Sequence, residues 1–364
     1  MSDQSPSALT GPPPLQPSGP PALGPHPPGL PHAVPPAHQK LTLYASGALV
    51  VVIVIVIILL GAGPRRAVLP YVPVGHRAVQ VIDLARYLDG PVHAALVAAE
   101  HPSARRLEAT EEKLGALFGR EVLLLAEADH MLILVGRLRP AALRSAFDRK
   151  VKAEEERINQ GRAQPIQLEI QQADLEGRPY YSCSQEALDL AFAPVGSSVA
   201  CFADVAGVRG FLKTCAGISK PVLSDEEFAA VYSPADARRA FVYRLEKTGG
   251  RILAQALADV VGPKQTDIRA AFFALTTVGK GIKVTARFLI TTDELATARE
   301  EQFNKDAGQK ALCEAFGAAP LVRVSRRGTL VTLEGFVPLD RFKEIAVQDK
   351  QGQARNLILA LLAR

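Results

Sequence analysis

The sequence predicts an α+β protein in which a single N-terminal transmembrane helix precedes antiparallel sheets with packed helices. Three features lead to this prediction: an uncharged apolar run at Leu41–Leu60, a proline-rich segment before it, and strand pairs that alternate with helices after it. They divide the chain into a disordered tail at 1–40, a membrane helix at 41–63, and two α+β subdomains at 64–222 and 223–364.

The apolar run, LTLYASGALVVVIVIVIILL, predicts a helix that crosses a lipid bilayer. About 20 residues at roughly 1.5 Å each match a hydrocarbon core of about 30 Å. The β-branched centre at Val50–Ile58 would suit a buried strand in water, but in lipid the backbone must pair within its own segment, which favours a helix. We therefore expect Leu41 to Gly63 to contact the bilayer. A cleavable signal peptide is the competing interpretation, because the Gly-Ala-Gly at 61–63 would permit cleavage, although the apolar run is longer than a signal core.

The segment 1–40 contains 13 of the 27 prolines, and Asp3 and Lys40 are its only charged side chains. It lacks the apolar periodicity that would offset the entropy of ordering, so we expect disorder with local polyproline II character. Two overlapping P-x-x-P motifs at Pro14–Pro20 match the minimal ligand of polyproline-binding domains, but such motifs arise by chance in any proline-rich tail. We interpret the segment as a spacer.

Two signals disagree about the side of the membrane on which the C-terminal region lies. Arg65 and Arg66 follow the apolar run and Lys40 precedes it, which by the positive-inside rule favours a cytoplasmic domain. An almost uncharged tail followed by a domain is the usual layout of a signal anchor, and four cysteines suit an oxidising compartment. We expect a single-pass protein of the inner (plasma) membrane with an extracytoplasmic, periplasmic domain.

The four cysteines all follow the apolar run, and none belongs to a C-x-x-C pair, so the sequence does not indicate a zinc or dithiol redox motif. Two interpretations stay open: two disulfides in one of three connectivities, or small buried apolar side chains. The residues are Cys183, Cys201, Cys215 and Cys313.

The first subdomain alternates strand and helix patterns. Its strands are expected at 76–84, 121–126, 130–135, 166–173, 178–183 and as a pair within 188–203, and its helices at 91–100, 104–117, 140–152 and 205–215.

The second subdomain follows a break at 217–223 and a capping box formed by Ser224 and Glu227, which opens a short helix. Another capping box, Thr291 with Glu294, opens a long helix that reaches 316. The remaining elements are expected as a strand at 239–245, hairpins at 266–291 and 321–337, and helices at 252–261, 340–347 and 354–363.

The two subdomains share one order of elements: strand, helix, hairpin, helix, strand pair, helix. Their first strands open alike, with Arg77-Ala78 in one and Arg239-Ala240 in the other. This order indicates an internal duplication. Hairpins that alternate with helices predict antiparallel sheets with helices packed on one face.

The sequence contains none of the common catalytic or nucleotide-binding motifs, such as G-x-S-x-G, G-x-x-x-x-G-K-[ST], G-x-G-x-x-G or H-E-x-x-H. Gly279-Lys280-Gly281 joins two expected strands and opens no helix, so we interpret it as a hairpin turn rather than a phosphate loop. The net charge of +5 comes from scattered Lys and Arg, and Trp is absent. No basic stripe interleaved with aromatics indicates nucleic-acid binding.

The histidines that follow the membrane segment fall in the first quarter of the soluble region. They could bind a metal, or they could act with nearby carboxylates in acid and base chemistry, but they are spread over four expected elements. The residues in question are His76, His93, His101 and His130, with Asp83, Asp89 and Asp129. Tyr180-Tyr181, beside Cys183, would suit a binding cleft, but aromatic residues in a strand are usually core or cross-strand pairs.

The layout of a proline-rich tail, one membrane helix and a duplicated α+β region resembles that of envelope proteins from bacteria with GC-rich genomes, in which Arg outnumbers Lys as it does here. The resemblance covers the layout and carries no site residues. We expect a membrane-anchored, non-enzymatic envelope protein that uses no cofactor and binds a protein or envelope component. The alternative is a hydrolase or metal-dependent enzyme that uses the His76 to His130 region, which would require these histidines to share one concave pocket.

Overall fold

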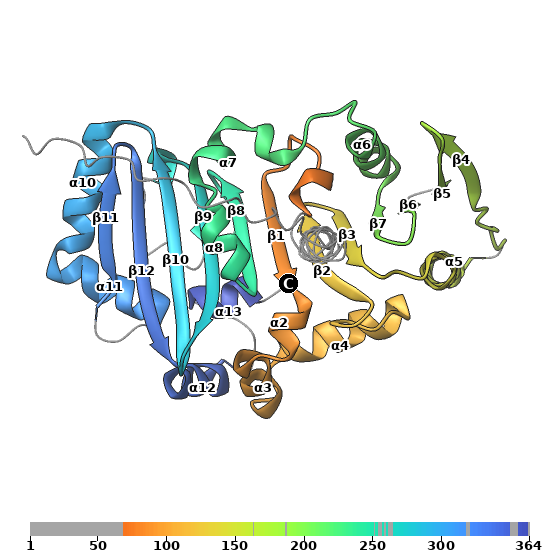
Figure 1. Ribbon diagram of the computed structural model, residues 1–364. Helices are drawn as coiled ribbons and strands as arrows, with labels where there is room; N and C mark the ends of the chain where they lie inside the picture. The colour runs from red at the N-terminus through yellow and green to blue at the C-terminus, as the bar shows by residue number, and fades with distance from the viewer. Residues whose placement is uncertain are drawn as a thin grey trace, which may run out of the picture. The chain divides into compact units, whose positions relative to one another are not determined.

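One antiparallel sheet of twelve strands runs through the protein, in the order β11-β12-β10-β9-β8-β1-β2-β3-β7-β6-β5-β4 (Figure 1). The computed structural model describes residues 68–162, 164–185, 188–250, 252–253, 257, 260, 265–317, 321–349 and 356–362. The predicted tail, the membrane helix and most of the predicted helix at 252–261 lie outside these residues. Within the described ranges, no helix has the length and apolar character needed to cross a bilayer.

The strands from residues 64–222 occupy one side of the sheet and those from residues 223–364 the other. The first set is β1 (Ala78–Asp83), β2 (Val122–Ala128), β3 (Met131–Gly136), β4 (Gln171–Leu175), β5 (Arg178–Gln185), β6 (Leu188–Val195) and β7 (Val199–Ala203). The second set is β8 (Val242–Lys247), β9 (Ile268–Val278), β10 (Gly281–Ile290), β11 (Arg323–Arg327) and β12 (Leu330–Pro338).

The β9–β10 hairpin shows how local sequence produces this sheet. Ile282, Val284 and Phe288 alternate with Lys283 and Arg287, and the first three are buried. The chain turns at Gly279-Lys280, between the paired residues Val278 and Gly281, and Gly279 has a φ of +54°. A φ in this range is easily adopted by glycine, so the predicted hairpin turn is confirmed.

Two separate apolar cores lie on the two faces of the sheet. In β1, Ile82 belongs to one core, whereas Val79 and Val81 belong to the other, because successive side chains of a strand point to opposite faces. The first core is covered by α2 (Leu84–Leu88), α3 (Pro91–Ala98), α4 (Pro102–Leu114), α5 (Pro140–Asn159), α10 (Asp293–Asn304), α11 (Asp306–Phe316), α12 (Leu339–Gln348) and α13 (Leu357–Leu362). The second is covered by the 3₁₀ turn η2 (Leu69–Tyr71) and by α6 (Val205–Cys215), α7 (Glu226–Val231) and α8 (Pro234–Arg239).

The prediction that helices pack on one face is therefore wrong. The central strands are apolar on both sides, since six of the seven residues of β2 are buried, so each face must be covered. The coarser prediction is confirmed: this is a mixed α+β fold with a large antiparallel sheet and packed helices.

The strand order repeats on the two sides of the central β1–β8 pair. Moving outward, one side reads β1-β2-β3-β7-β6 and the other reads β8-β9-β10-β12-β11, with the same chain order in both. The β5–β4 hairpin extends only the first side. The sheet continues across the predicted boundary at 217–223, because β1 and β8 pair directly, with Val81 opposite Tyr243.

Several element boundaries differ from the prediction for local reasons. The expected long helix after Thr291 is two helices, α10 and α11, because Lys305 between them is extended at φ −72° and ψ 152°. The N-terminal cap of α10 is Thr292, which lies one residue later than expected. The cap of α7 is Asp225 instead of Ser224, since its carboxylate accepts from the N–H groups of Glu227 and Phe228.

The predicted strand at 166–173 begins only at Gln171. The residues before it are bound to the end of α5 instead of a strand. The side-chain amide of Asn159 exchanges two 2.8 Å hydrogen bonds with the backbone of Ile166, and Glu155 Oε2 accepts from Leu168 N at 2.6 Å. The backbone groups of Ile166 and Leu168 are therefore hydrogen-bonded to side chains of α5 and not to a neighbouring strand.

Candidate functional site

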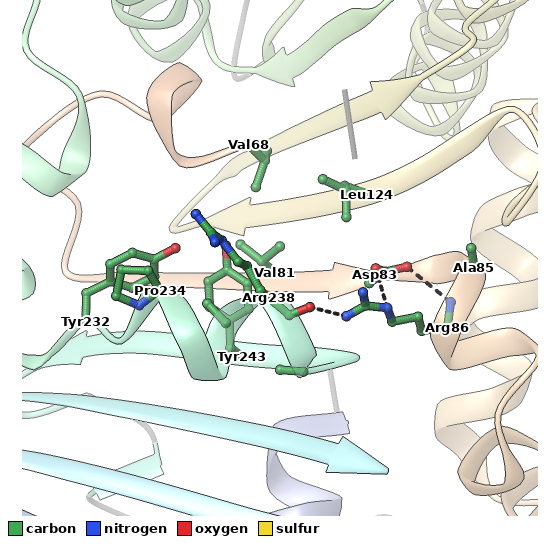
Figure 2. Close-up of a pocket in the computed structure, with 12 residues that line it drawn as sticks. Val68, Val81, Asp83, Ala85, Arg86, Leu124, Tyr232, Pro234, Arg238 and Tyr243 are labelled. Atoms are coloured by element: carbon green, nitrogen blue, oxygen red, sulfur yellow. Dashed lines mark hydrogen bonds and ion pairs between the residues drawn. The ribbon is translucent and has the colours of Figure 1, made fainter. Parts of the chain in front are cut away.

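A hollow of about 500 Å³ lies over the centre of the sheet, between α8 and the β1–β8 pair (Figure 2). We call it the central hollow. Its floor is formed by Val81, Leu124 and Tyr243, and its rim by Arg86, Tyr232 and Arg238. The other residues that line it are Val68, Asp83, Ala85, Pro234, Ala237 and Ala240. The volume and the mixture of apolar floor and convergent polar groups are typical of a small-molecule site.

The floor comes from three neighbouring strands. Val81 of β1 lies opposite Tyr243 of β8, and Leu124 of β2 lies opposite Asp83 of β1. Val81 and Leu124 are buried at 1% and 5% exposure, so the floor offers an apolar surface at its deepest point. Both predicted subdomains therefore contribute to the same site.

One wall is the short helix α8, which the sequence analysis did not predict. Ser233 caps it, with its hydroxyl accepting from Asp236 N at 3.3 Å, and Pro234 occupies its first turn. The carboxylate of Asp236 also accepts from Arg287 of β10 at 2.8 Å, which fixes the helix to the sheet. This anchoring holds Arg238, in the last turn, beside the hollow.

Two tyrosines meet at the edge of the floor. Tyr232 and Tyr243 are joined by a side-chain hydrogen bond, and both rings contact Phe272, with centroid distances of 6.0 and 6.1 Å. Burial raises the pKa of the Tyr243 phenol well above its ordinary value and also raises the pKa of Tyr232, where the charge of Arg238 opposes the shift. Both phenols are therefore neutral at physiological pH.

The two arginines on the rim have different surroundings. Arg86 Nε lies 3.4 Å from Asp83 Oδ2, and its Nη1 donates to the backbone carbonyl of Arg238. Figure 2 shows the Arg238 side chain extending away from that contact and across the hollow, in front of Val81. Among the described residues, the Arg238 guanidinium makes no hydrogen bond or ion pair, and its charge acts on the pKa of Tyr232. Arg238 is exposed, so solvent reaches it.

A second hollow of about 820 Å³ lies between α4, α5 and strands β3, β6 and β7. Leu132, Phe147 and Phe202 form its apolar wall, and Asp204 and Lys150 lie among its charged groups. These charges are used locally: Asp204 caps α6 through a 2.6 Å bond from Gly207 N, and Lys150 pairs with Glu154. The second hollow is more apolar than the central hollow, and its Asp204 and Lys150 already have local partners.

The histidines singled out by the sequence lie in different places. His76, just before β1, has its Nδ1 2.9 Å from Asp129 Oδ2 in the β2–β3 turn, where His130 is the next residue. His93 and His101 come after β1, whereas His76 comes before it. At roughly 3.3 Å per residue, the length of β1 separates His76 from the other two histidines. His130 lines the second hollow, whereas the other three line neither hollow.

His93 and His101 have roles in packing. The His93 ring meets Tyr87 edge-on at 5.2 Å, and burial lowers its pKa. His101 caps α4 by accepting from Ser103 N at 3.2 Å, and its Nε2 lies 3.5 Å from Oδ2 of Asp349, the residue that follows α12. Within the described part of the chain, no three His, Cys, Asp or Glu side chains gather in a way that could hold a metal.

The other side chains considered from the sequence also take up structural positions. Asp83 caps α2, and Asp89 lies exposed at the end of that helix. Tyr180 and Tyr181 point to opposite faces: the Tyr180 hydroxyl accepts from Arg209 Nη2 at 3.0 Å, and the Tyr181 ring stacks on Phe192 at 6.2 Å.

The cysteines occupy the two cores. Cys183 and Cys201 are buried free thiols in opposite cores, so these two cannot be joined in this fold. Cys215 is a half-buried free thiol, and burial raises its pKa to about 11. Cys313 is half-buried on α11.

The similarity of the chain to known proteins is limited to solved structures. No protein-family model and no curated protein matches it. Crystal form III of TP0453 aligns at 12% sequence identity and a TM-score of 0.44, and the alignment covers 77% of this chain and 97% of that one. Crystal form I of TP0453 aligns at 13% sequence identity and a TM-score of 0.41, with coverage of 80% of this chain and 96% of that one. The chain is similar to TP0453. At this level the similarity carries no argument about function.

Of the residues that line the central hollow, Asp83 was singled out from the sequence and the others were not. Ser233-Pro234 followed by Asp236 is a helix-start signal that would have located α8. No local signal could have placed Arg238 near Arg86, because 152 residues separate them and only the sheet brings them together.

Proposed function

We propose that the chain is a membrane-anchored, non-enzymatic envelope protein whose α+β region binds an envelope component in the central hollow. The observation that carries this proposal is the composition of the hollow: an apolar floor with a few convergent polar groups and no Ser, Cys, Thr, His or Lys among the residues that line it. A ligand can be held there, while the two phenols are neutral and the Asp83 carboxylate is already engaged by the side chain and the backbone N–H of Arg86.

We also propose that the α+β region arose by internal duplication, with halves at 64–222 and 223–364. The repeated strand order supports this, because two copies of a five-strand unit that meet through β1 and β8 would produce that order. A duplicated sheet forms a new surface where its copies join, and the central hollow lies at that join.

The membrane anchor and location complete the proposal. The apolar run 41–63 supports a single span, and the signal-anchor layout supports an extracytoplasmic position for the α+β region at the inner membrane. A ligand from the envelope would then have direct access to the hollow.

The alternative function is a hydrolase or metal-dependent enzyme that uses the His76 to His130 region. The observation in its favour is the 2.9 Å contact between His76 and Asp129, since a carboxylate that orients a histidine is a common part of catalytic sites. The separation of His93 and His101 from this pair counts against it.

The two functions can be distinguished with the full chain purified in detergent. Cell-envelope extract is divided by ultrafiltration into macromolecular and small-molecule fractions, and each fraction is tested for its effect on the unfolding temperature. We expect the small-molecule fraction to raise it for the natural protein and for Arg239→Gln, which alters a neighbouring arginine outside the hollow, but not for Arg238→Gln. Two results would instead establish the alternative function. One is a metal ion bound at one equivalent per chain, and the other is hydrolysis of an ester or phosphoester that Asp129→Asn abolishes.

A further inference from the structure

We propose that the ligand of the central hollow is an organic monoanion with an apolar body, and that its charged group binds the guanidinium of Arg238. The inference rests on the proposed binding function and specifies the chemistry of the ligand. Three observations carry it: the charge balance of the rim, the freedom of Arg238, and the shape of the floor.

The charge balance leaves a single positive charge to be matched. The hollow is lined by two guanidinium groups, Arg86 and Arg238, and by one carboxylate, Asp83. Asp83 lies 3.4 Å from Arg86 and so compensates that arginine. The surplus is one positive charge, which a carboxylate, sulfonate or phosphodiester would neutralise and a phosphomonoester dianion would exceed.

Arg238 is the group that can receive this anion. The Arg86 guanidinium is already bound to Asp83 and to the Arg238 carbonyl, whereas the Arg238 guanidinium has no hydrogen-bonded acceptor in the described residues. A guanidinium presents a planar fork of N–H donors that fits two oxygens of one anionic group. Figure 2 shows this fork on the side of the hollow next to Val81.

The tyrosine pair adds one further donor. A hydrogen bond between Tyr232 and Tyr243 uses one of their two hydroxyl hydrogens, so the second hydrogen is available to a ligand oxygen. The floor of Val81, Leu124 and the Tyr243 ring requires an apolar body, because a small hydrated anion would leave it uncovered.

The test uses a matched pair of probes, 2-naphthoate and 2-naphthamide, which share an aromatic body and differ in charge. Each is titrated by isothermal calorimetry into the full chain in a non-ionic detergent, with the heat of the detergent alone subtracted. We expect 2-naphthoate to bind at least about tenfold more tightly than 2-naphthamide, since a charged hydrogen bond contributes about 1.5 kcal/mol or more. Inorganic phosphate, which lacks the apolar body, should not bind at the same concentration.

Variants locate the effect. Arg238→Gln should remove the preference for 2-naphthoate and leave 2-naphthamide within about twofold, and Arg238→Lys should restore part of it. Arg239→Gln, on the same helix, and Arg149→Gln, in the second hollow, should leave both affinities unchanged. A circular dichroism spectrum of each variant confirms folding.

The outcomes separate this inference from the function on which it rests. Equal affinity for the two probes, or a preference that persists in Arg238→Gln, would overturn the monoanion inference and leave a binding hollow in place. Failure of both probes to bind, together with no stabilisation by envelope small molecules, would overturn the proposed function as well.

Discussion

Val81 of β1 lies directly opposite Tyr243 of β8, and this pair joins the two halves of the sheet beneath the central hollow. Each residue is part of the strand that opens its half. The site therefore exists only when both halves are folded against each other, so loss of the β1–β8 pairing would remove the site together with the continuity of the sheet.

A buried carboxylate on β8 should contribute strongly to stability. Glu246 is fully buried and accepts from Arg244 Nε at 2.8 Å and from Leu253 N at 2.8 Å. We expect Glu246→Ala to lower the free energy of unfolding by about 3–5 kcal/mol, because it leaves buried donors unpaired. Glu344→Ala removes an exposed ion pair with Arg341 and should cost less than about 1 kcal/mol. Equal effects in urea denaturation would contradict this assignment.

Stability should fall in acid through Asp225. Burial by itself would raise the pKa of this carboxyl, but hydrogen bonds from Lys247 and from backbone N–H groups outweigh it and place the pKa below its ordinary value of 3.8. The unfolded chain then binds the proton more readily, so this contribution is present above about pH 3.8 and is lost as pH falls through the lower, folded value. Asp225→Asn should flatten the pH dependence of the urea midpoint below pH 4, relative to Asp89→Asn at the exposed end of α2.

Two glycines should respond oppositely to alanine. A Cβ at Gly136 would lie 1.9 Å from the carbonyl oxygen of Glu121, so Gly136→Ala should destabilise the fold by more than about 2 kcal/mol. Gly210, inside α6, has only ordinary contacts with Pro73, and Gly210→Ala should stabilise by about 0.5–1 kcal/mol through helix propensity. Thermal unfolding of both variants tests this, and a stable Gly136→Ala would show that the approach of the two strands is looser than described.

The tyrosine pair should respond to the charge of Arg238. Because that charge opposes the rise of the Tyr232 pKa, Arg238→Gln should raise this pKa further. Spectrophotometric titration of phenolate absorbance, with Tyr232→Phe to identify the signal, measures the shift. An unchanged titration curve would mean that Arg238 does not face Tyr232.

Membrane orientation can be tested with an introduced thiol. Ser145 is exposed on α5, so Ser145→Cys supplies a reactive site that the buried native Cys183 and Cys201 do not. If the domain is extracytoplasmic, a membrane-impermeant maleimide should label this variant in intact spheroplasts. Labelling only after lysis would place the domain in the cytoplasm.

Local sequence was sufficient where one element carries its own signal. The Val205–Cys215 helix was predicted with its observed bounds, and the β9–β10 hairpin followed from the alternation of Ile282, Val284 and Phe288 with polar residues. Such patterns act within one turn of helix or across one hairpin, so the strands and most of the helices could be read in order from the sequence, although α8 was not. The apolar run at 41–63 predicts a membrane span in the same way, from its own length and composition.

The tertiary structure alone decided how these elements meet. The halves form one sheet because the backbone edges of β1 and β8 pair with each other. Backbone edges have the same hydrogen-bonding groups whatever the side chains are, so the sequence does not indicate this pairing. The central hollow follows from that pairing, because Arg86 and Arg238 come from separate halves and meet only across the joined sheet. The sequence determined which segments are strands and helices, and the long-range pairing of strands determined where a ligand can bind.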